Sequence, residues 1–522
     1  MAKPIIDWDA WSASTIAPIM KAVIHLESGD IEVTDDEISY ISYTLHSFDS
    51  QYIMFGPPVP GTASLEIIDY KQRFNPVTNH ELIAGVQIDM FLGLRSTDTF
   101  EKLGDNLIAS VGTPQWVTWQ GRRFYAVPAT TTIILPTDAE YVLTFDTELA
   151  DGTTEHVRRT VNNSISSDYT IQIALINTDI VAVKNLELRQ RLDIWQPYGT
   201  WYAQEWSFDS SGSTCTVDLV DGLNDLLTLD NRADARPPSV DVPLKQFLLE
   251  LVSLQLPNIM STINVSTRLK YSFYEDTQAK TINNCVVALM ACLFMMPDNE
   301  VALSSPRGNY TPNITLTDDD VIAYTIQQTS AITADSAIVH AMLPTSIEAS
   351  EILSQNELTL TRGTNLPLNV SGVQSVDYMV ATGLDATDIT NLFYDWDPAS
   401  VHITTYTDTS VIPEKTSVYG HIIDCSDVPI SEVAGTLPYV ISDNKYIQTV
   451  EHAQVMSRTL SKFINLPYST VQVEIRGGYG IWLGAKIQLV SKRYAINANY
   501  TVIGMLFTYD GSVSTVLTLQ RY

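Results

Sequence analysis

Two acidic triplets are the first residues of this chain whose spacing could support chemistry. The triplets at residues 35–37 and 318–320 each follow a threonine, Thr34 and Thr317. A threonine hydroxyl can cap the start of a helix or turn, and acidic side chains suit the positive end of a helix dipole. The alternating oxygen ligands and central glycine of a calcium loop are missing. We therefore interpret both triplets as helix or turn starts rather than as metal sites.

A second candidate combines acids with an aromatic ring. Asp395, Trp396, Asp397 and His402 are the residue types of a carbohydrate site, in which an aromatic face supports the sugar. A packed β-domain surface explains the same residues, so both interpretations stay open. An acid glycoside hydrolase would need two carboxylates about 5 to 9.5 Å apart across a cleft, a distance that sequence does not give.

Motifs of known catalytic sites are absent from the chain. It contains no HExxH, no GxSxG, no phosphate-binding glycine loop and no CxxC, and its eight histidines are dispersed. We therefore expect no catalytic residues, no metal site and no cofactor, and we expect that the protein is not an enzyme.

The composition is polar and acidic rather than highly charged. Charged residues make up 17% of the 522 residues, and the formal net charge is −30. Such a charge argues against direct attraction to a nucleic-acid backbone. An acidic surface around a passage would instead repel DNA and keep it from adhering. Solubility alone is the alternative explanation.

Four cysteines do not suffice for a disulfide framework. Cys285 and Cys292 fall in a helix predicted over residues 281–294, where they would lie about 10 Å apart along the axis, too far to bridge. We expect small buried thiols, kept reduced in the cytoplasm. Residues 1–9 lack a signal-peptide pattern, and the longest apolar stretch, 286–296, is too short to span a bilayer. No stable membrane insertion is therefore expected.

The last fifty residues show the clearest strand pattern. Val471, Val473 and Ile475 alternate with polar residues, the period of a strand with one buried face. Asp510-Gly511 predicts a type I′ hairpin turn, in which both central residues have positive φ. The remaining strands are expected around residues 487–489, 500–508 and 513–519.

Helical patterns are fewer and lie mostly in the middle of the chain. Pro243 suits a helix start, and Leu244, Phe247, Leu248 and Leu251 follow at helical spacing. Further helices are predicted near Asp221, over residues 281–294 and near residues 446–464.

The pattern as a whole predicts a mainly β fold with a minor α+β part, in which two antiparallel β-barrel tube domains flank a mixed α/β middle region. The expected parts are an N-terminal arm at 1–19, a first β-barrel domain at 20–230 with an inserted β-hairpin region at 128–190, a middle domain at 231–345, and a second β-barrel domain at 346–522.

One hairpin in the insertion stands out by its two-sided polarity. Residues 141–160 turn at Ala150-Asp151-Gly152 and are polar on much of both faces. A two-stranded hairpin with little apolar surface to bury is not stable alone. We therefore expect this hairpin to lie at an interface with another subunit or partner.

The order of several segments resembles a known family. The segments are LESGDIEVTDDEIS, IMFGPPVPGTASLEIID, PYGTWYAQEWSFDSSGSTCTVDLVDGLNDLL, TINNCVVALMACLF, and a closing helix, a strand ending in Arg-Gly and a Tyr-Asp-Gly hairpin. Together they resemble the central tail hub proteins of bacteriophages, which include contractile-tail baseplate hubs and the N-terminal module of siphophage tail-tip proteins. The likeness covers most of the chain except residues 1–19 and 128–190.

The resemblance implies a structural protein of the virion tail or baseplate, assembled in the bacterial host cytoplasm. It implies a homotrimer whose two barrels per chain form a pseudo-sixfold ring. That ring would join the sixfold tail tube or distal tail protein to a threefold spike, fibre or receptor-binding protein. Its lumen would admit the tape-measure protein, and DNA would pass without specific binding.

The family pattern also limits what this polypeptide is expected to do. No endopeptidase, lysozyme or receptor-binding region follows the closing strands, so we expect separate partners to bind or cut the host. A glycan-binding tail adhesin and a distal tail ring protein remain the alternatives.

Overall fold

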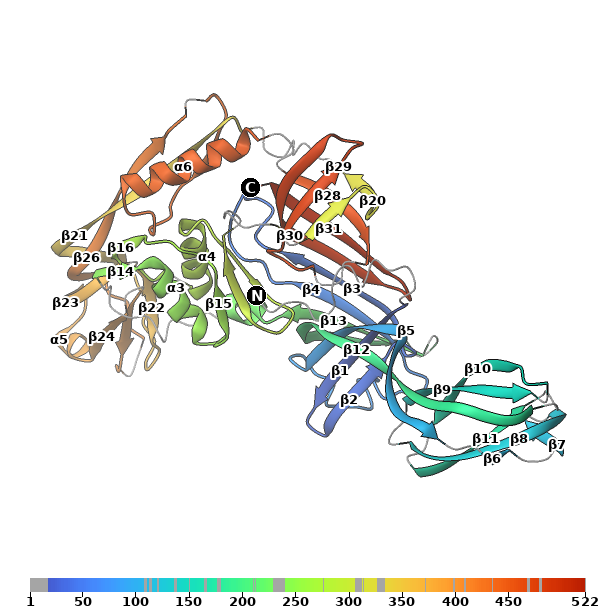
Figure 1. The fold of residues 1–522 in the computed structure, drawn as a ribbon. Coiled ribbons are helices and arrows are strands. Elements are labelled where there is room, and N and C mark those ends of the chain that lie inside the picture. The colour runs from blue at the N-terminus through green and yellow to red at the C-terminus, as the bar shows by residue number, and fades with distance from the viewer. Residues whose placement is uncertain are drawn as a thin grey trace. The chain divides into compact units, whose positions relative to one another are not determined.

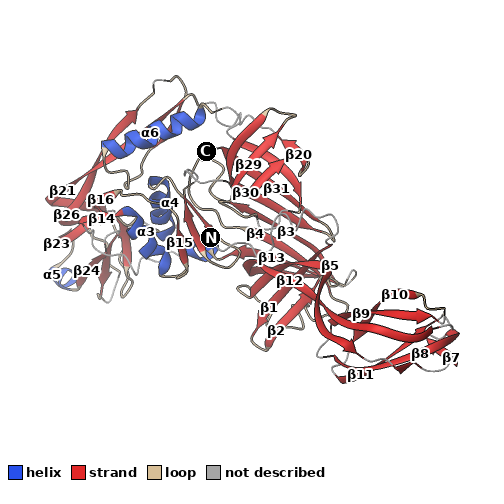
Figure 2. Ribbon diagram, in the orientation of Figure 1, coloured by secondary structure: helices blue, strands red, loops and turns tan. Residues whose placement is uncertain are grey.

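The computed structural model describes residues 17–521, with short gaps at 108–109, 112–114, 120–121, 136–138, 150, 164–166, 176–179, 210, 212, 229–239, 276, 306–311, 313, 326–333, 371, 398–399, 408–409, 434, 467–469 and 478–480. Most of the expected N-terminal arm lies outside the described residues. The chain divides into two compact units, one containing Met20–Phe91 and Pro197–Tyr522 and the other containing Leu92–Gln196. Strands dominate both units, which confirms the mainly β fold (Figure 2).

The first unit is built on one large sheet (Figure 1). Its strands lie in the order β2-β1-β5-β12-β13-β4-β3-β30-β31-β28-β20, while β29 pairs with β30 and β19 pairs with β29. Their bounds are β1 Ala17–Leu26, β2 Gly29–Thr34, β3 Ile38–His46, β4 Thr62–Ile68, β5 Gln87–Leu107, β12 Ile180–Asp209, β13 Thr214–Asp221, β19 Ile314–Thr317, β20 Val321–Thr325, β28 Thr470–Arg476, β29 Lys486–Ser491, β30 Ile496–Tyr509 and β31 Val513–Arg521.

The two ends of the sequence meet in the centre of this sheet. Strands β3 and β30 pair antiparallel from Ile41 opposite Tyr509 to His46 opposite Gly504. Blue β3 and red β30 therefore lie side by side although most of the chain separates them (Figure 1). The N-terminal and C-terminal strands share one sheet rather than forming two sheets that only touch.

An aromatic core fills the inner face at this junction. Tyr43 of β3 stacks on Phe507 of β30 with ring centroids 4.7 Å apart. Tyr198, Trp201 and Trp482 lie 5.7, 5.7 and 5.8 Å from the Tyr43 ring. These five side chains, here called the junction core, come from β3, β12 and the C-terminal part of the chain and bury large apolar surfaces together.

One hydrogen bond connects the junction core to the middle of the chain, and one glycine makes room for its rings. The Trp482 indole Nε1 donates a hydrogen bond of 2.8 Å to the carbonyl of Met295. Gly199 has φ of +114°, and a Cβ built there would lie 2.6 Å from Trp201 Nε1. Glycine is therefore required at this position for both backbone conformation and space.

The middle of the chain is mixed α/β, as its pattern predicts. Helix α3, Leu244–Ser253, follows Pro243 and buries the predicted apolar stripe. Helix α4, Gln278–Ala288, is capped by the Thr277 side chain, which accepts a hydrogen bond from Lys280 N. The short strands of this region are β14 Val240–Pro243, β15 Ile259–Ser261, β16 Arg268–Tyr271, β17 Cys292–Met295 and β18 Val301–Ser304.

The helix expected over residues 281–294 is too long and needs correction. Helix α4 ends at Ala288, Met290 has φ of +51°, and Cys292–Met295 form strand β17 paired with β18. All four residues of β17 are buried. A short apolar run buried on both sides does not distinguish helix from strand by its periodicity, which explains the error.

Helix α6 and the sheet on which it packs form a separate part of the first unit, here called the α6 layer. Helix α6, Val450–Ile464, matches the helix expected near 446–464 and packs on a sheet of order β23-β26-β21-β27. The strands are β21 Ser336–Asn356, β23 Val373–Thr382, β26 Lys415–Ser431 and β27 Pro438–Ile441. Just before α6, Tyr446 donates to the Phe273 carbonyl at 2.8 Å and Gln448 donates to the Tyr271 carbonyl at 2.7 Å. These bonds attach the α6 layer to the middle region.

A small three-stranded sheet completes the first unit. Its order is β22-β25-β24, with bounds Leu366–Asn369, Ser400–Thr405 and Leu392–Asp397, and helix α5, Ala386–Thr390, precedes β24. Its core contains Leu360, Leu368, Val401, Ile403, Val411 and Val418.

The second unit is entirely β in its described part. Strands β9 Ala139–Leu149 and β10 Thr154–Asn163 form the expected long hairpin, and β9 also pairs with β12. A second sheet joins β11, β8 and β6, with β7 paired to β8. Their bounds are β6 Ser110–Val111, β7 Gln115–Trp119, β8 Arg122–Leu135 and β11 Ser167–Leu175. The unit takes in residues 92–127 as well as the expected insertion.

The C-terminal strands confirm the sequence pattern, with one correction. Val471, Val473 and Ile475 are buried on β28, and β29, β30 and β31 form where expected. The turn at Asp510-Gly511 is not type I′, because only Gly511 has positive φ and Tyr509 pairs with Val513 across a three-residue loop. The Asp510 carboxylate accepts a hydrogen bond from Ser512 N, which favours this longer loop.

Candidate functional site

The outer face of the junction carries a row of hydroxyl groups. Ser64 pairs with Ser42, Ser42 with Thr508, and Thr508 with Ser514, so one row crosses strands β4, β3, β30 and β31. Each lies between residues buried on the opposite face, and each is partly exposed. We call these four residues the hydroxyl row. It spans the junction without interruption.

The hydroxyl row has acids near its β4 end and an arginine at its β31 end, where Arg476 of β28 lies opposite Ser514. Strands β13, β4, β3 and β30 include no lysine or arginine. Asp218 lies opposite Ser64 at one end of the row, and Glu66 lies two residues from Ser64 on the same face. Neutral donors and acceptors with a few carboxylates bind water well, and strands β4, β3 and β30 carry no lysine or arginine that would attract phosphate.

A buried carboxylate fixes the strand that carries Ser64. Asp221, at the end of β13, accepts hydrogen bonds from Gly61 N at 2.8 Å and Leu223 N at 3.0 Å. It thereby positions the start of β4 and caps α2, Leu223–Thr228, the short helix expected near Asp221. Burial raises the pKa of Asp221 to about 7, and these backbone bonds oppose the shift.

Both acidic triplets lie in turns, as one of the two readings predicts. Residues 318–320 connect β19 to β20, where Thr317 N donates to Asp320 Oδ2 at 2.8 Å. Asp318 accepts hydrogen bonds from Tyr324 and Lys492 N. The Ser491 side chain, followed by these donors, holds the pKa of Asp318 below its usual range. Residues 35–37 form the turn between β2 and β3. Within the described residues, no group of three or more His, Cys, Asp or Glu could hold a metal ion.

The candidate carbohydrate residues are divided between two faces of one sheet. Asp395 lies directly opposite His402 in the β24–β25 pair. Trp396 instead packs against the buried core of this sheet. Trp396 is therefore not an exposed platform, a placement that the sequence could not give because apolar residues occur on both faces of β24. The exposed ring on the Asp395 face is Phe393.

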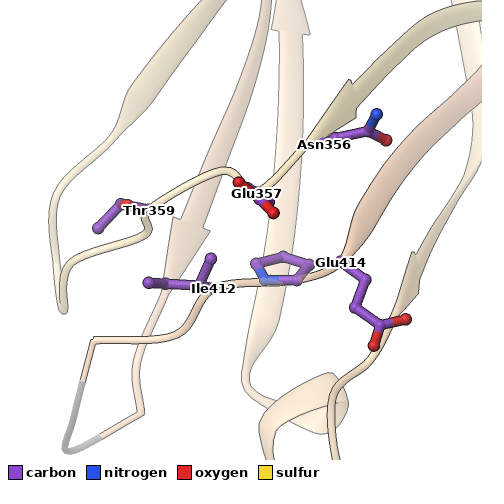
Figure 3. Close-up of a pocket in the computed structure, with 6 residues that line it drawn as sticks. Asn356, Glu357, Thr359, Ile412 and Glu414 are labelled. Atoms are coloured by element: carbon purple, nitrogen blue, oxygen red, sulfur yellow. The ribbon is translucent and has the colours of Figure 1, made fainter.

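A shallow pocket of about 730 Å³ lies near the ends of β21 and β26 (Figure 3). Asn356, Glu357, Thr359, Ile412, Pro413 and Glu414 line it. Glu357 N donates to the Glu414 carbonyl at 3.3 Å, while the Glu414 side chain extends away from Glu357 (Figure 3). The two carboxylates do not converge on one point, so the pocket lacks the geometry of an acid–base pair.

The cysteines are free thiols in the described chain. Cys285 and Cys292 are buried, one on α4 and the other on β17. Burial raises the pKa of Cys292 to about 12, so its thiol stays protonated and unreactive. This fits the expected role of small buried side chains.

In the described residues, none of the helices combines the length and the apolar character that crossing a membrane requires.

No protein-family profile matches the sequence, and no curated protein matches it significantly. Several solved structures that are similar to the chain are described as tail or baseplate proteins. The 43 kDa tail protein of prophage MuSo2 from Shewanella oneidensis has 9% identity and a TM-score of 0.44, with 96% of this chain and 98% of that chain covered. A tail protein from Neisseria meningitidis has 7% identity and a TM-score of 0.41, with 96% of each chain covered.

A third similar structure is the prophage tail protein gp18 from Listeria monocytogenes, with 6% identity, a TM-score of 0.36, and 95% and 94% of the two chains covered. Since all three TM-scores are below 0.5 and all identities are below 10%, no residue's role follows from this likeness.

Proposed function

We propose that this chain is a structural hub of a phage tail or phage-derived particle, located in the virion tail or baseplate. Three copies form a pseudo-sixfold ring that joins the sixfold tail tube or distal ring to a threefold tip. The ring encloses a lumen for the tape-measure protein and DNA. The protein acts through shape and symmetry, without catalytic turnover.

The observation that carries this proposal is the sheet that β3 and β30 complete. Strands from the N-terminal and C-terminal parts of the chain pair across the junction, so each chain presents one continuous sheet as a wall. In that wall β4 and β3 lie directly beside β30 and β31. Such a wall suits a ring in which three chains supply six sheet segments.

The hydroxyl row suits the inner surface of such a ring. Its four hydroxyls are flanked by Asp218 and Glu66 at the β4 end and by Arg476, opposite Ser514, at the β31 end. DNA moving past strands β13, β4, β3 and β30 would meet water-binding groups and no lysine or arginine that holds a phosphate. The net charge of −30 of the whole chain also disfavours binding of DNA.

The ring is tested by the mass and symmetry of the full-length chain. Sedimentation velocity should give a three-chain species, and electron microscopy of the purified protein or particle should show a threefold axis. A monomer at all concentrations, or a ring without a threefold axis, would reject the hub.

The lumen assignment is tested separately by adding positive charge. Ser42→Lys with Ser64→Lys should leave the ring intact but make it retain duplex DNA, measured by fluorescence anisotropy at low salt. The matched control is Gln355→Lys with Asn356→Lys, which adds equal charge at exposed positions at the end of β21. Equal DNA retention by both variants would place the hydroxyl row outside the lumen.

The hairpin at residues 141–160 is proposed as an interface element. Strand β10 pairs only with β9 among the described strands, so its outer edge offers unpaired backbone groups. Deleting residues 141–160 should impair assembly with partners, and normal particles from that variant would contradict the proposal.

Glycan-binding tail adhesin remains the alternative function. It would use the face of β24 and β25 that carries Asp395 and His402, with Phe393 in the role that sequence gives to Trp396. Binding to a glycan array that Phe393→Ala abolishes would favour it.

A further inference from the structure

The outer face of the β22-β25-β24 sheet exposes aromatic rings in a fixed arrangement. Phe393 and Tyr406 are 52% and 56% exposed, and their ring centroids lie 5.5 Å apart in an edge-to-face contact. Asp395 shares a face of β24 with Phe393, and its cross-strand neighbour is His402. We call Phe393, Asp395, His402 and Tyr406 the aromatic surface.

These rings cannot avoid water by turning inward. The inner face of the same sheet is filled by Leu392, Trp396 and the buried cluster around Val401. Tyr406 N donates to the Asn391 carbonyl at 3.0 Å, which fixes the chain just before β24 and just after β25. The surface is therefore organised in advance, which lowers the entropy cost of binding a partner.

Exposed apolar side chains concentrate in this part of the chain. Seven of the twenty large hydrophobic side chains that are exposed in the described residues fall between residues 378 and 412. They are Tyr378, Val380, Ile389, Phe393, Tyr394, Tyr406 and Ile412. Among them Phe393 and Tyr406 contact each other, and exposed rings in contact are typical of interaction surfaces, whereas scattered ones need no explanation.

The charge of the same segment selects the kind of partner. Residues 373–414 contain seven acids and no lysine or arginine. The acids are Asp377, Asp385, Asp388, Asp395, Asp397, Asp408 and Glu414. This local excess of carboxylates favours a partner segment that brings positive charge to the surface.

We propose that the aromatic surface docks a segment of a different polypeptide that carries arginine or lysine next to apolar side chains. A guanidinium group stacks well on an exposed ring and pairs with a neighbouring carboxylate. Phe393 and Tyr406 supply the rings and Asp395 the carboxylate. This proposal needs only the folded chain and stands independently of the hub.

The test uses the full-length chain and a short fluorescent peptide with the repeat Arg-Leu-Ser. Binding is measured by fluorescence anisotropy at physiological salt, with a Glu-Leu-Ser peptide as the charge-reversed probe. The basic peptide should bind, and Phe393→Ala with Tyr406→Ala should weaken it by about tenfold, as removal of central aromatic contacts does. Asp395→Asn should weaken it less, and the acidic peptide should not bind.

Tyr70→Ala is the matched control, because Tyr70 is exposed on a different segment, in the loop after β4. Tyr70→Ala should leave peptide binding unchanged, and circular dichroism should show that all variants fold. Equal binding by wild type and the double variant would overturn the proposal, because attraction would then be purely electrostatic. Self-association or glycan binding that the double variant abolishes would overturn it as well, by assigning the surface to another occupant.

Discussion

The junction core and the aromatic surface use the same residue types with opposite results. In the junction core, five aromatic side chains from distant parts of the chain are buried together. Around Phe393, two rings meet edge to face and stay more than half exposed. The ring-to-ring distances are similar, so contact between rings does not by itself reveal their role.

The difference lies in what covers each set. A second part of the chain closes over the junction core, and Trp482 adds a hydrogen bond to the Met295 carbonyl. Nothing in the described chain closes over Phe393, because the core of its sheet lies on the opposite face. The first set therefore stabilises the fold, while the second remains available for a partner.

Trp482→Ala should produce the largest loss of stability. Removing a buried tryptophan leaves a cavity and costs about 3–5 kcal/mol of unfolding free energy, and Trp482 is only 6% exposed. Urea unfolding followed by intrinsic fluorescence would measure the loss. Trp482→Phe keeps part of the packing and loses the bond to Met295, so it should cost clearly less; equal losses would show that the cavity is not the cause.

Asp221 should make the free energy of unfolding depend on pH, with a predictable sign. Burial raises its folded-state pKa to about 7 from the ordinary 3.8, so the folded protein holds a proton that the unfolded chain releases between these values. The free energy of unfolding therefore falls as pH rises through this window, by the order of 2–4 kcal/mol. Asp221→Asn should remove that slope in urea titrations at pH 4 to 7.

Asp335→Asn is the control for this slope. Backbone donors from Thr436 and Leu437 lower the pKa of Asp335 to about 2. A depressed pKa stabilises the fold above the unfolded value of 3.8, and this stabilisation is lost only as pH falls toward 2. Asp335→Asn should thus leave the slope between pH 4 and 7 unchanged, and a slope that persists in Asp221→Asn would refute the assignment.

Substituting Gly199 and Gly29 should distinguish the cost of steric crowding from the cost of backbone strain. Gly199 has φ of +114° and an added Cβ would meet Trp201, whereas Gly29 has φ of +129° and nothing within 4 Å. Gly29→Ala should cost about 1 kcal/mol through strain alone. Gly199→Ala should cost about 2–3 kcal/mol, since Trp201 must also move. Equal losses of stability for the two variants in thermal unfolding would mean that Trp201 can move aside without cost.

Local periodicity predicted much of the fold around the junction. The alternation of Val471, Val473 and Ile475 and the apolar stripe of α6 each correspond to an observed element. The pairing of β3 with β30 could not be predicted from the sequence. Residues 41 and 509 are far apart in the chain, and no local pattern shows that they lie opposite each other. The hydroxyl row was missed for the same reason, although serine and threonine alternate with apolar residues in each of its strands.

The candidate site shows the limit of periodicity more sharply. In β24, Leu392, Tyr394 and Trp396 alternate with Phe393 and Asp395, so apolar residues occur on both faces. A period of two tells which residues share a face but not which face meets the core. The sequence grouped Asp395 and His402, which pair across β24 and β25, and left open whether Trp396 is an exposed platform or packs in the domain, as the structure shows it to do.

Phe393→Ala should have the smallest effect on stability and test this assignment of faces. An exposed cross-strand ring contributes about 0.5 kcal/mol, whereas Trp396→Ala removes a ring that packs on the core and should cost about 2 kcal/mol or more. Both unfolding free energies can be measured by urea titration of the full-length chain. If Phe393→Ala proved as costly as Trp396→Ala, Phe393 would be a structural residue like those of the junction core. The contrast between a covered and an uncovered aromatic set would then fail, because both sets would be needed for the fold.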